Sequence, residues 1–404
     1  MPRLLQINST ANWGSTGKIA ELIGAHAISC GWDSYIAYGR YANPSASCLI
    51  KIGARVSQLW HLVLSRLFDN HGLASRIATK LLIRKIEKLN PDVIHLHNIH
   101  GYYLNYKLLF EYLISINTPV VWTLHDCWPF TGHCAHYVHD GCCQWQKVCT
   151  RKDCSRLYPS SFLSQTKRNF NLKKTLFTSL GDRIVMAPVS SWLADQTQKS
   201  FLGKHRIKFI YNGIDTSVFA PKDVRHLKRE LNIDGKKVLI GVASAWSEGK
   251  GFSDYIELRK KLSGDYVIIM VGINPADIVK LPHGIIGVMR TQSPQELAEL
   301  YSVADVVLSL SRAETFGLTV AEGMSCGTPA IVYNNTAAPE LITDDTGIVV
   351  NRTGDVDGVV KAIETVLARG KQSYTDACRR RAVEHFDNRK CSAKYLDLYN
   401  ELLA

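Results

Sequence analysis

The sequence is poor in the features that mark disordered, fibrous and membrane-spanning chains. Only 21% of its 404 residues are charged while 46% are hydrophobic, which excludes intrinsic disorder. The 28 Gly and 13 Pro are too few for a collagen-like chain. No run of 18 uncharged apolar residues occurs, so no segment is predicted to span a bilayer. Residues 1–8 lack the pattern of a secretory signal, and we therefore expect a cytoplasmic protein.

The common phosphate-binding motifs are also missing in their complete form. The segment Asn12–Lys18 (NWGSTGK) follows an expected strand and opens an expected helix, where free N–H groups favour a phosphate. It lacks the first Gly and the final Ser or Thr of a Walker A loop, and it also lacks the G-x-G-x-x-G order. Two interpretations stay open, a phosphate contact at Gly14 and Gly17 or a tight turn without a ligand.

The excess of positive over negative charge lies in one half of the chain. Residues 1–206 hold 24 Lys and Arg against 11 Asp and Glu, an excess of 13 positive charges. Residues 207–404 hold 24 against 25, an excess of one negative charge. Nucleic acid, an anionic membrane or a polyanionic substrate would each suit the basic half.

The 11 cysteines are an odd number, and six of them lie between residues 127 and 154. In a reducing compartment such clustering favours metal over disulfides. We predict a structural Zn²⁺ bound by thiolates of the cluster, although no C-x₂-C knuckle is present and unliganded thiols remain the alternative. The candidate ligands are Cys134, Cys142, Cys143, Cys149 and Cys154.

Short β-branched runs alternate with longer helical stretches along the whole chain, which predicts an α/β protein with parallel sheets. In the first half, the expected strands are 4–7, 34–38, 92–96, 119–124 and 183–187, and the expected helices are 17–29, 75–89, 105–116 and 160–180. The rhythm restarts after Asn212, with expected strands at 237–242, 266–271, 306–310 and 330–333 and a helical tail at 372–403. We expect two doubly wound domains, 1–206 and 207–387, with a helix at 388–404 that packs back on the first domain.

Two carboxylates, Glu314 and Glu322, follow the expected strand 306–310. Eight residues on one helix advance about 12 Å, so the pair could not share one reacting atom there. Gly317 instead predicts that Glu314 lies on the loop, that the helix starts near residues 316–318, and that Glu322 lies in its second turn. The free N–H groups of residues 316–319 would then bind an anion, with a carboxylate on either side for sugar hydroxyls. Two solvated glutamates are the alternative.

Two further polar residues follow expected strands. Lys250, before Gly251, follows the strand 237–242, and His125 ends the strand 119–124. Ligands of open α/β sheets bind at the carboxyl ends of parallel strands, so both side chains could contact substrate. An exposed loop lysine and a structural histidine are the competing interpretations.

The chain resembles the GT-B glycosyltransferases of family 4 over nearly its whole length. The resemblance rests on the order and spacing of Thr123–Asp126 (TLHD), Asn212–Asp215 (NGID), Lys250-Gly251 and the segment from Glu314 to Pro329. Within that family, HLHNIHGYY at 95–103 and WPFTGHC at 128–134 resemble the branch that builds bacterial capsule, exopolysaccharide and colanic-acid-type polymers.

The resemblance implies two Rossmann-like domains that face each other across a cleft, with the nucleotide sugar held by the C-terminal one. It implies a retaining transfer that requires no metal. By position, Glu322 would accept the ribose hydroxyls and Lys250 would neutralise the leaving diphosphate, while His125 would contact the donor sugar. Glu314, Phe316, Gly317 and Leu318 would hold the sugar and phosphates, and Gly14 to Gly17 would border phosphate and acceptor.

One position departs from the family pattern. The family usually carries an Arg shortly before the Lys, and this sequence has Ala245 and Gly249 there. We expect Arg290 or Arg312 to assist Lys250, because the developing charge lies on a diphosphate that cations stabilise.

We therefore expect a glycosyltransferase that uses a UDP- or GDP-sugar and a glycan or lipid-linked glycan acceptor, and that binds no nucleic acid. A GT-B-like epimerase or phosphorylase is the alternative among enzymes, and a zinc-bearing nucleic-acid-binding protein is the alternative outside them. Two basic amphipathic segments, 76–88 and 167–174, suggest peripheral contact with an anionic membrane. The expected contacting cations are Lys167, Arg168, Lys173 and Lys174, and a solvated face on a buried helix is the alternative.

Overall fold

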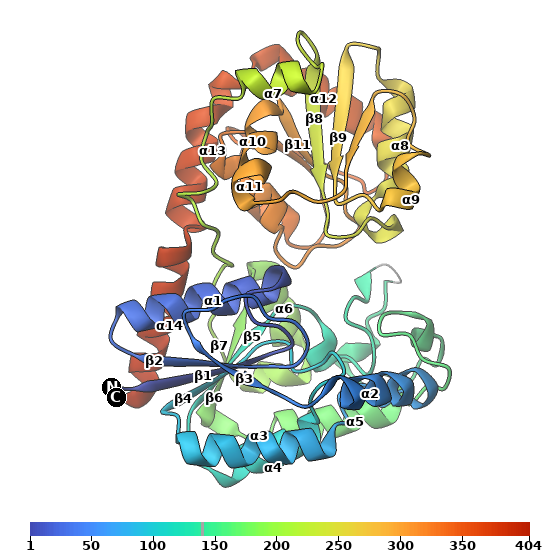
Figure 1. The fold of residues 1–404 in the computed structure, drawn as a ribbon. Coiled ribbons are helices and arrows are strands. Elements are labelled where there is room, and N and C mark those ends of the chain that lie inside the picture. Colours follow the sequence, from blue (N-terminus) through green and yellow to red (C-terminus); the bar gives the residue numbers. More distant parts are fainter. Residues whose placement is uncertain (139–140) are drawn as a thin grey trace. The chain divides into compact units, whose positions relative to one another are not determined.

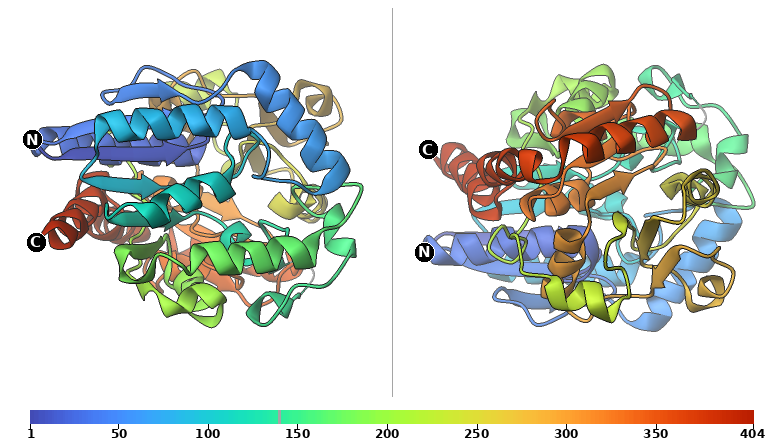
Figure 2. Two further views of the ribbon diagram at one scale, coloured as in Figure 1. Left: turned by 90° about the horizontal axis from the view of Figure 1, so that it is seen from below. Right: turned by 90° about the horizontal axis from the view of Figure 1, so that it is seen from above.

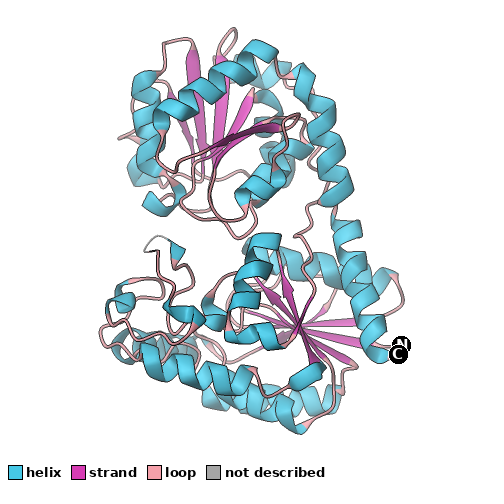
Figure 3. Cartoon of the chain, turned by 180° about the vertical axis from the view of Figure 1, so that it is seen from behind, coloured by secondary structure: helices cyan, strands magenta, loops and turns pink. Residues whose placement is uncertain are grey.

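The structure is a computed structural model that describes residues 1–138 and 141–404. It contains two compact units (Figure 1). Unit 1 comprises residues 1–211 together with 391–404, and unit 2 comprises residues 212–390. Each unit is built on a parallel β-sheet with helices on both of its faces, as Figure 3 shows with strands in magenta and helices in cyan. This confirms the predicted α/β class with two Rossmann-like domains.

The sheet of unit 1 has seven strands in the order β3-β2-β1-β4-β5-β6-β7, and every pair is parallel. Its central strands are buried on both faces, which is why they read as continuous apolar runs. The strands are β1 (Arg3–Asn8), β2 (Asp33–Tyr38), β3 (Cys48–Lys51), β4 (Val93–Leu96), β5 (Val120–Leu124), β6 (Ile184–Pro188) and β7 (Arg206–Ile207).

Helices cover both faces of this sheet, and Figure 2 shows the face that carries α3 and α4 from below. The helices are α1 (Gly14–Ser29), α2 (Arg55–Phe68), α3 (Arg76–Leu89), α4 (Tyr106–Ser115), α5 (Thr166–Phe177) and α6 (Ser191–Lys199). A last helix, α14 (Asn388–Leu403), belongs to this unit from residue 391 onward.

Two tyrosines hold α14 against the sheet of unit 1. The Tyr399 hydroxyl donates to His95 Nδ1 at 2.6 Å, and the Thr123 hydroxyl donates to the Tyr395 oxygen at 2.9 Å. His95 Nε2 lies 2.7 Å from the same Thr123 oxygen, so β4, β5 and α14 share one buried hydrogen-bond chain.

The sheet of unit 2 has six parallel strands in the order β10-β9-β8-β11-β12-β13. They are β8 (Lys237–Val242), β9 (Tyr266–Val271), β10 (Ile285–Val288), β11 (Val306–Ser309), β12 (Ala330–Tyr333) and β13 (Gly347–Val350). The helices around it are α7 (Arg225–Glu230), α8 (Phe252–Lys261), α9 (Pro275–Ile278), α10 (Pro294–Val303), α11 (Leu318–Ser325), α12 (Val356–Arg369) and α13 (Gln372–His385).

The order of the strands decides which loops become neighbours. In unit 2, β8 and β11 are paired at the middle of the sheet, so the loops after their carboxyl ends lie side by side. In unit 1, β4 lies between β1 and β5 and pairs with both. The carboxyl ends of these strands are where the sequence places its candidate site residues.

Candidate functional site

The predicted residues Lys250 and Glu314 meet in unit 2. The short 3₁₀ helix Glu248–Lys250 follows β8, and Glu314 lies on the loop after β11. The Lys250 ammonium donates to Glu314 Oε1 at 2.6 Å. The Lys250 side chain is 37% exposed and that of Glu314 is 19% exposed, so an incoming ligand can reach this ion pair.

Gly251 allows the backbone to bring Lys250 close to Glu314. Its φ is +74°, and a Cβ at this position would lie 2.2 Å from the carbonyl oxygen of Leu310. Only glycine therefore lets the backbone after Lys250 pass so close to the end of β11. The close approach to Leu310 therefore explains why a glycine follows Lys250 in the sequence.

Helix α11 begins beside Glu314 with an uncapped N-terminus. Gly317, with φ +109°, is its N-cap residue and offers no side-chain acceptor, and its first turn holds no acidic residue. The helix starts at Leu318, within the predicted interval, and Phe316 is buried just before it. The N–H groups of the first turn together with the helix dipole favour an anion at this end.

Glu322 lies in the second turn of α11, as predicted. Its Oε2 accepts a hydrogen bond of 3.0 Å from the hydroxyl of the fully buried Tyr301 on α10. Tyr301 thereby orients the carboxylate, which is itself only partly buried. Nothing in the sequence pattern singled out Tyr301, because a tyrosine on an amphipathic helix is typical of a core position.

The two arginines expected to assist Lys250 have different surroundings. The Arg312 guanidinium donates to the buried carboxylate of Asp254 at 2.6 Å, and the Tyr333 hydroxyl donates to the other oxygen of Asp254 at 2.7 Å. Arg312 therefore has a buried structural partner. Arg290 lies just after β10 and is exposed.

In unit 1, Gly14 and Gly17 lie in the first turn of α1. Gly14 has φ +64° with open space around its Cβ position, whereas a Cβ on Gly17 would lie 2.7 Å from the Thr10 hydroxyl. Gly17 thus lets the loop after β1 fold over the start of the helix. The first turn of α1 holds no acidic residue, so this end also favours an anion.

His125 directly follows β5 and is buried in a polar chain. Its Nε2 lies 3.0 Å from Nδ1 of His97, the Nε2 of His97 lies 3.0 Å from Gln6 Oε1, and the Gln6 amide nitrogen donates to the Ala20 carbonyl at 2.8 Å. Burial lowers the pKa of His125 to about 4 and lowers that of His97 well below its usual value. Both rings are therefore neutral at pH 7.

The neighbouring Asp126 is a buried carboxylate held in its charged form. His100 Nε2 lies 2.8 Å from its Oδ2, and the backbone N–H of Trp128 donates to its Oδ1 at 2.9 Å. Burial alone would raise the pKa of Asp126, but His100 and the other contacts outweigh it and lower the pKa to about 2. We identify Asp126 as a fixed charge that anchors the turn after β5.

Sequence reasoning missed Gln6, His97 and His100 as parts of this arrangement. A signal was available for one of them, since His97 follows β4 directly and is two residues after His95, so both side chains are expected on the same side of the extended chain. Gln6 gave no such signal, because its role depends on the strand order that brings β1 next to β4.

The predicted zinc ligands are only partly gathered. Cys134, Cys149 and Cys154 are buried, Cys142 is half-buried and Cys143 is exposed. The Cys134 thiol donates toward Cys154, which lowers the pKa of Cys154 to about 7, and the backbone N–H of Gly132 donates to Cys149 at 3.3 Å. Among residues 1–138 and 141–404 no three His, Cys, Asp or Glu side chains are arranged to hold a metal ion. The described geometry does not support a metal site, and zinc stays a prediction for metal analysis of the purified protein.

The predicted membrane-contacting helix 167–174 needs a correction. It forms α5, but its Lys173 is buried, with the ammonium 3.4 Å from the centre of the Trp128 ring and donating to the Trp128 carbonyl at 2.7 Å. Phe170 and Phe177 are also buried. The apolar side of α5 therefore packs in the core, and the four cations do not form one surface.

Two family descriptions match most of the chain. Residues 53–218 match "Glycosyltransferase Family 4", and residues 223–383 match "Glycosyl transferases group 1". The first match lies mostly within unit 1, and the second lies within unit 2.

Curated relatives carry related names. A putative colanic acid biosynthesis glycosyl transferase, WcaC, of Escherichia coli K12 is 26% identical over 85% of this chain and 86% of its own length. The N-acetyl-alpha-D-glucosaminyl L-malate synthase of Bacillus anthracis is 28% identical over 54% of this chain, and the match spans 60% of its own length.

Solved structures share the fold over the full length. Sucrose-phosphate synthase from Thermosynechococcus elongatus has a TM-score of 0.73 at 16% identity and covers 100% of this chain and 99% of its own. Anabaena HepE, solved in complex with UDP-glucose, has a TM-score of 0.64 at 15% identity and covers 99% of both chains.

Proposed function

Since the chain belongs to glycosyltransferase family 4 and is a glycosyltransferase with a GT-B fold, we propose that it transfers a sugar, with retention, from a UDP- or GDP-sugar to a glycan or lipid-linked glycan acceptor of a surface polysaccharide. The single observation that carries the donor class is the Lys250–Glu314 pair beside the uncapped start of α11. A cation next to free helical N–H groups suits a diphosphate. Family membership favours a transferase over the epimerase, phosphorylase and nucleic-acid alternatives.

In the proposed reaction, the donor diphosphate lies at the carboxyl edge of the unit 2 sheet. Negative charge accumulates on the diphosphate as the bond from the sugar breaks, and Lys250 with the α11 N–H groups stabilises that charge. Glu322, oriented by Tyr301, accepts hydrogen bonds from the ribose hydroxyls. Glu314, released from Lys250, accepts hydrogen bonds from hydroxyl groups of the donor sugar. The reaction as proposed requires no metal.

A panel of nucleotide sugars tests the donor class directly. We expect UDP or GDP, and the matching nucleotide sugars, to raise the unfolding temperature of the protein, because a ligand that binds only the folded state stabilises it by mass action. We then expect slow hydrolysis of the stabilising nucleotide sugar, in which water replaces the acceptor and the products are the free sugar and the nucleoside diphosphate. No stabilisation and no release with any UDP- or GDP-sugar would contradict the proposal.

We also propose that unit 1 contacts an anionic membrane through a face formed by α2, α3 and the segment after β3, which we call the α2–α3 face. Large apolar side chains are exposed there, with Ile77 77% and Trp60 61% exposed. Such side chains on a basic amphipathic surface suit the boundary between headgroups and acyl chains. Among the described residues, every helix is too short or too polar to span a bilayer.

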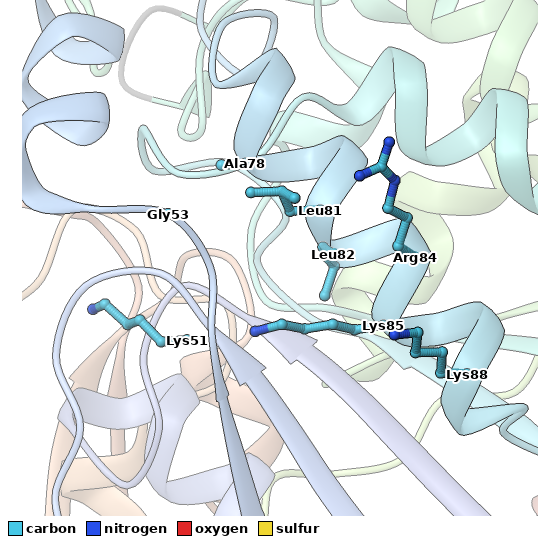
Figure 4. Close-up of a pocket in the computed structure, with 8 residues that line it drawn as sticks. All are labelled: Lys51, Gly53, Ala78, Leu81, Leu82, Arg84, Lys85 and Lys88. Atoms are coloured by element: carbon cyan, nitrogen blue, oxygen red, sulfur yellow. The ribbon is translucent and has the colours of Figure 1, made fainter.

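The α2–α3 face holds two hollows that combine cations with apolar walls. One, of about 360 Å³, is lined by Leu81 and Leu82 of α3 and by four basic side chains, Lys51, Arg84, Lys85 and Lys88. Figure 4 shows Lys85 extending from α3 toward the segment that carries Lys51. The other, of about 400 Å³, is lined by Trp60 and Ile77 with Arg76 and Lys80. Anionic lipid headgroups are complementary in charge to both.

A further inference from the structure

The loop that follows β12 holds the backbone of Glu314. The Glu314 N–H donates to the hydroxyl oxygen of Thr336 at 2.8 Å, and the Glu314 carbonyl accepts from the Ala337 N–H at 3.1 Å. Strands β11 and β12 are paired, so the loops at their carboxyl ends are neighbours. Both backbone groups of Glu314 are therefore bonded to two consecutive residues, and these bonds are separate from the ion pair between its side chain and Lys250.

Thr336 has a backbone conformation that β-branched residues rarely adopt. Its φ is +45°, in the left-handed region that favours glycine. A glycine would adopt this conformation with less strain, but it would offer no hydroxyl to the Glu314 N–H. Strain of this kind persists where the surrounding structure imposes it, and it is concentrated at functional sites. The conformation of Thr336 therefore points to a role for its hydroxyl group.

Asn335 sets the direction of that hydroxyl. The Ser311 carbonyl only accepts hydrogen bonds, so the Asn335 atom that faces it at 2.9 Å is the amide nitrogen. The Asn335 Oδ1 atom is then an acceptor, and the Thr336 hydroxyl donates its hydrogen there at 3.3 Å. The lone pairs of the hydroxyl oxygen are thereby left for the Glu314 N–H. Asn335 and Thr336 together bond both ends of the segment 311–314.

The same segment is bonded on its other side to the loop after β8. The Arg312 N–H donates to the Gly249 carbonyl at 2.9 Å, and Gly249 directly precedes Lys250. In the proposed reaction the Glu314 carboxylate leaves Lys250 when the donor binds. The bonds from Thr336 and Ala337 join backbone atoms of Glu314, so they can persist while its side chain changes partner.

We infer that Thr336 is a positioning residue, whose hydroxyl keeps the backbone of Glu314 in place while the Glu314 carboxylate leaves Lys250 for the hydroxyl groups of the donor sugar. The inference deepens the proposed function and rests on it in one respect, namely that Glu314 binds the donor sugar. A carboxylate on a fixed backbone loses less conformational freedom on binding than one on a mobile loop, so it binds the sugar more tightly. The effect is specific to the sugar, because Lys250 and the first turn of α11 serve the diphosphate.

The hydrogen bond itself is measurable without any donor. Residue-resolved hydrogen exchange of the full chain reports the protection of the Glu314 amide. We expect Thr336→Val, which removes the hydroxyl and keeps the shape of the side chain, to accelerate exchange at Glu314, and Thr336→Ser to preserve slow exchange. Lys250→Ala should preserve it too, because the ion pair is separate from this bond. Equal exchange in the parent and Thr336→Val, or lost protection in Lys250→Ala, would overturn the inference.

Binding separates the positioning of Glu314 from general stability. We expect the dissociation constant of the stabilising nucleotide sugar to rise several-fold in Thr336→Val and to stay near the parent value in Thr336→Ser, while that of UDP or GDP alone stays unchanged in both. Thr336→Gly relieves the strained φ but lacks the hydroxyl, so it should unfold at a higher temperature than Thr336→Val and yet bind the nucleotide sugar as weakly. Affinity that follows the unfolding temperature across the three variants would show a structural role only.

The matched control is Thr343→Val, because the Thr343 hydroxyl donates to Asp345 in its own loop, and we expect the affinity for the nucleotide sugar to stay unchanged. A second comparison tests whether Thr336 acts through Glu314. Adding Thr336→Val to Glu314→Ala should weaken sugar binding no further, and an additive loss would overturn the inference. If no nucleotide sugar binds to the parent protein, the proposed function fails, whereas the exchange rates at Glu314 still decide whether Thr336 holds its backbone.

Discussion

Lys250 and Glu314 neutralise each other in the absence of a ligand, so replacing either one removes one charge and leaves the other without its partner. Lys250→Ala leaves Glu314 without its cation and leaves the diphosphate with only the helical N–H groups. We expect the rate to fall by about 10² to 10³, which corresponds to about 2 to 4 kcal/mol of lost electrostatic stabilisation. Measured turnover of the preferred nucleotide sugar gives the loss, and we expect the same range for Glu322→Ala.

The exposed lysine Lys280 provides the matched control for this experiment. It also pairs with a carboxylate, Asp277 at 3.1 Å, but it lies on the loop after α9. Lys280→Ala should retain the parent rate, and both variants should unfold near the parent temperature because surface ion pairs contribute little to stability. Near-normal turnover by Lys250→Ala would remove Lys250 from the reaction.

A buried histidine makes unit 1 sensitive to acid. His61 on α2 accepts a hydrogen bond from the Gly72 N–H at 3.1 Å, and burial lowers its pKa to about 4. Between pH 6.5 and pH 4 the unfolded chain binds a proton at this residue and the folded chain does not, so stability falls as pH falls. From pH 7 to pH 5 this residue contributes a loss of about 2 kcal/mol.

Urea unfolding at pH 7 and pH 5 measures that loss. His61→Gln should reduce the difference in unfolding free energy between the two pH values, because the amide does not titrate in this range. His283→Gln, on an exposed loop of unit 2, should leave the difference as it is in the parent. An unchanged difference in His61→Gln would show that other groups cause the acid sensitivity.

At the scale of the element, the close approach of two loops depends on Gly251. An alanine there would combine a strained positive φ with a Cβ 2.2 Å from the Leu310 carbonyl, so the loop that carries Lys250 must shift. We expect Gly251→Ala to lower the free energy of unfolding by about 1 to 3 kcal/mol, which is the strain of one residue in such a backbone conformation. We also expect it to lower turnover toward that of Lys250→Ala.

Gly264→Ala is the comparison for this variant. A Cβ on Gly264 has no atom within 4 Å, and its φ is not in the left-handed region. Chemical denaturation and turnover should both be near the parent values. If Gly251→Ala behaves like Gly264→Ala, the loop tolerates the side chain and the packing argument fails.

The buried elements were predictable from the sequence, and the edge elements were not. The predicted strands 237–242, 266–271 and 330–333 coincide with β8, β9 and β12, because a buried parallel strand is a continuous apolar run. The strands β3, β7, β10 and β13 were not predicted, and they are short strands of two or four residues at the edges of the two sheets. Edge strands bury less apolar surface, so their pattern carries less signal.

Some helices were also predicted with wrong bounds or not predicted, for a different reason. The expected helix 160–180 is shorter in the structure, as α5 (Thr166–Phe177), and α2 was not predicted. The face of α2 is apolar yet exposed, so the usual link between apolar residues and the core does not hold there. For the site, the sequence identified residues on loops after strands, whereas Tyr301, Gln6 and Asp254 act through neighbours that only the strand order supplies.

At the scale of the whole molecule, the excess of 13 positive charges in residues 1–206 predicts salt-dependent binding to anionic vesicles. Each cation near an anionic surface contributes about 1 kcal/mol, so Lys85→Gln with Lys88→Gln should weaken binding by about 30-fold. Flotation with anionic and neutral vesicles at low and physiological salt measures this binding.

The matched control removes the same charge from another surface. Lys167→Gln with Lys174→Gln alters two exposed cations of α5 and should leave vesicle binding nearly unchanged. Trp60→Ala should weaken binding without changing its salt dependence, because it removes apolar contact only. Equal recovery on anionic and neutral vesicles would refute the membrane contact of the α2–α3 face.

Unit 1 is discontinuous in sequence, and this sets an order for its folding during synthesis. The ribosome produces residues 212–390, the whole of unit 2, before it produces the segment 391–404. Until then His95 and Thr123 lack the hydroxyl partners that Tyr399 and Tyr395 supply. Unit 2, which is continuous in sequence, can therefore complete its core before unit 1 does, because the sheet of unit 1 gains α14 only after residues 212–390 have been made.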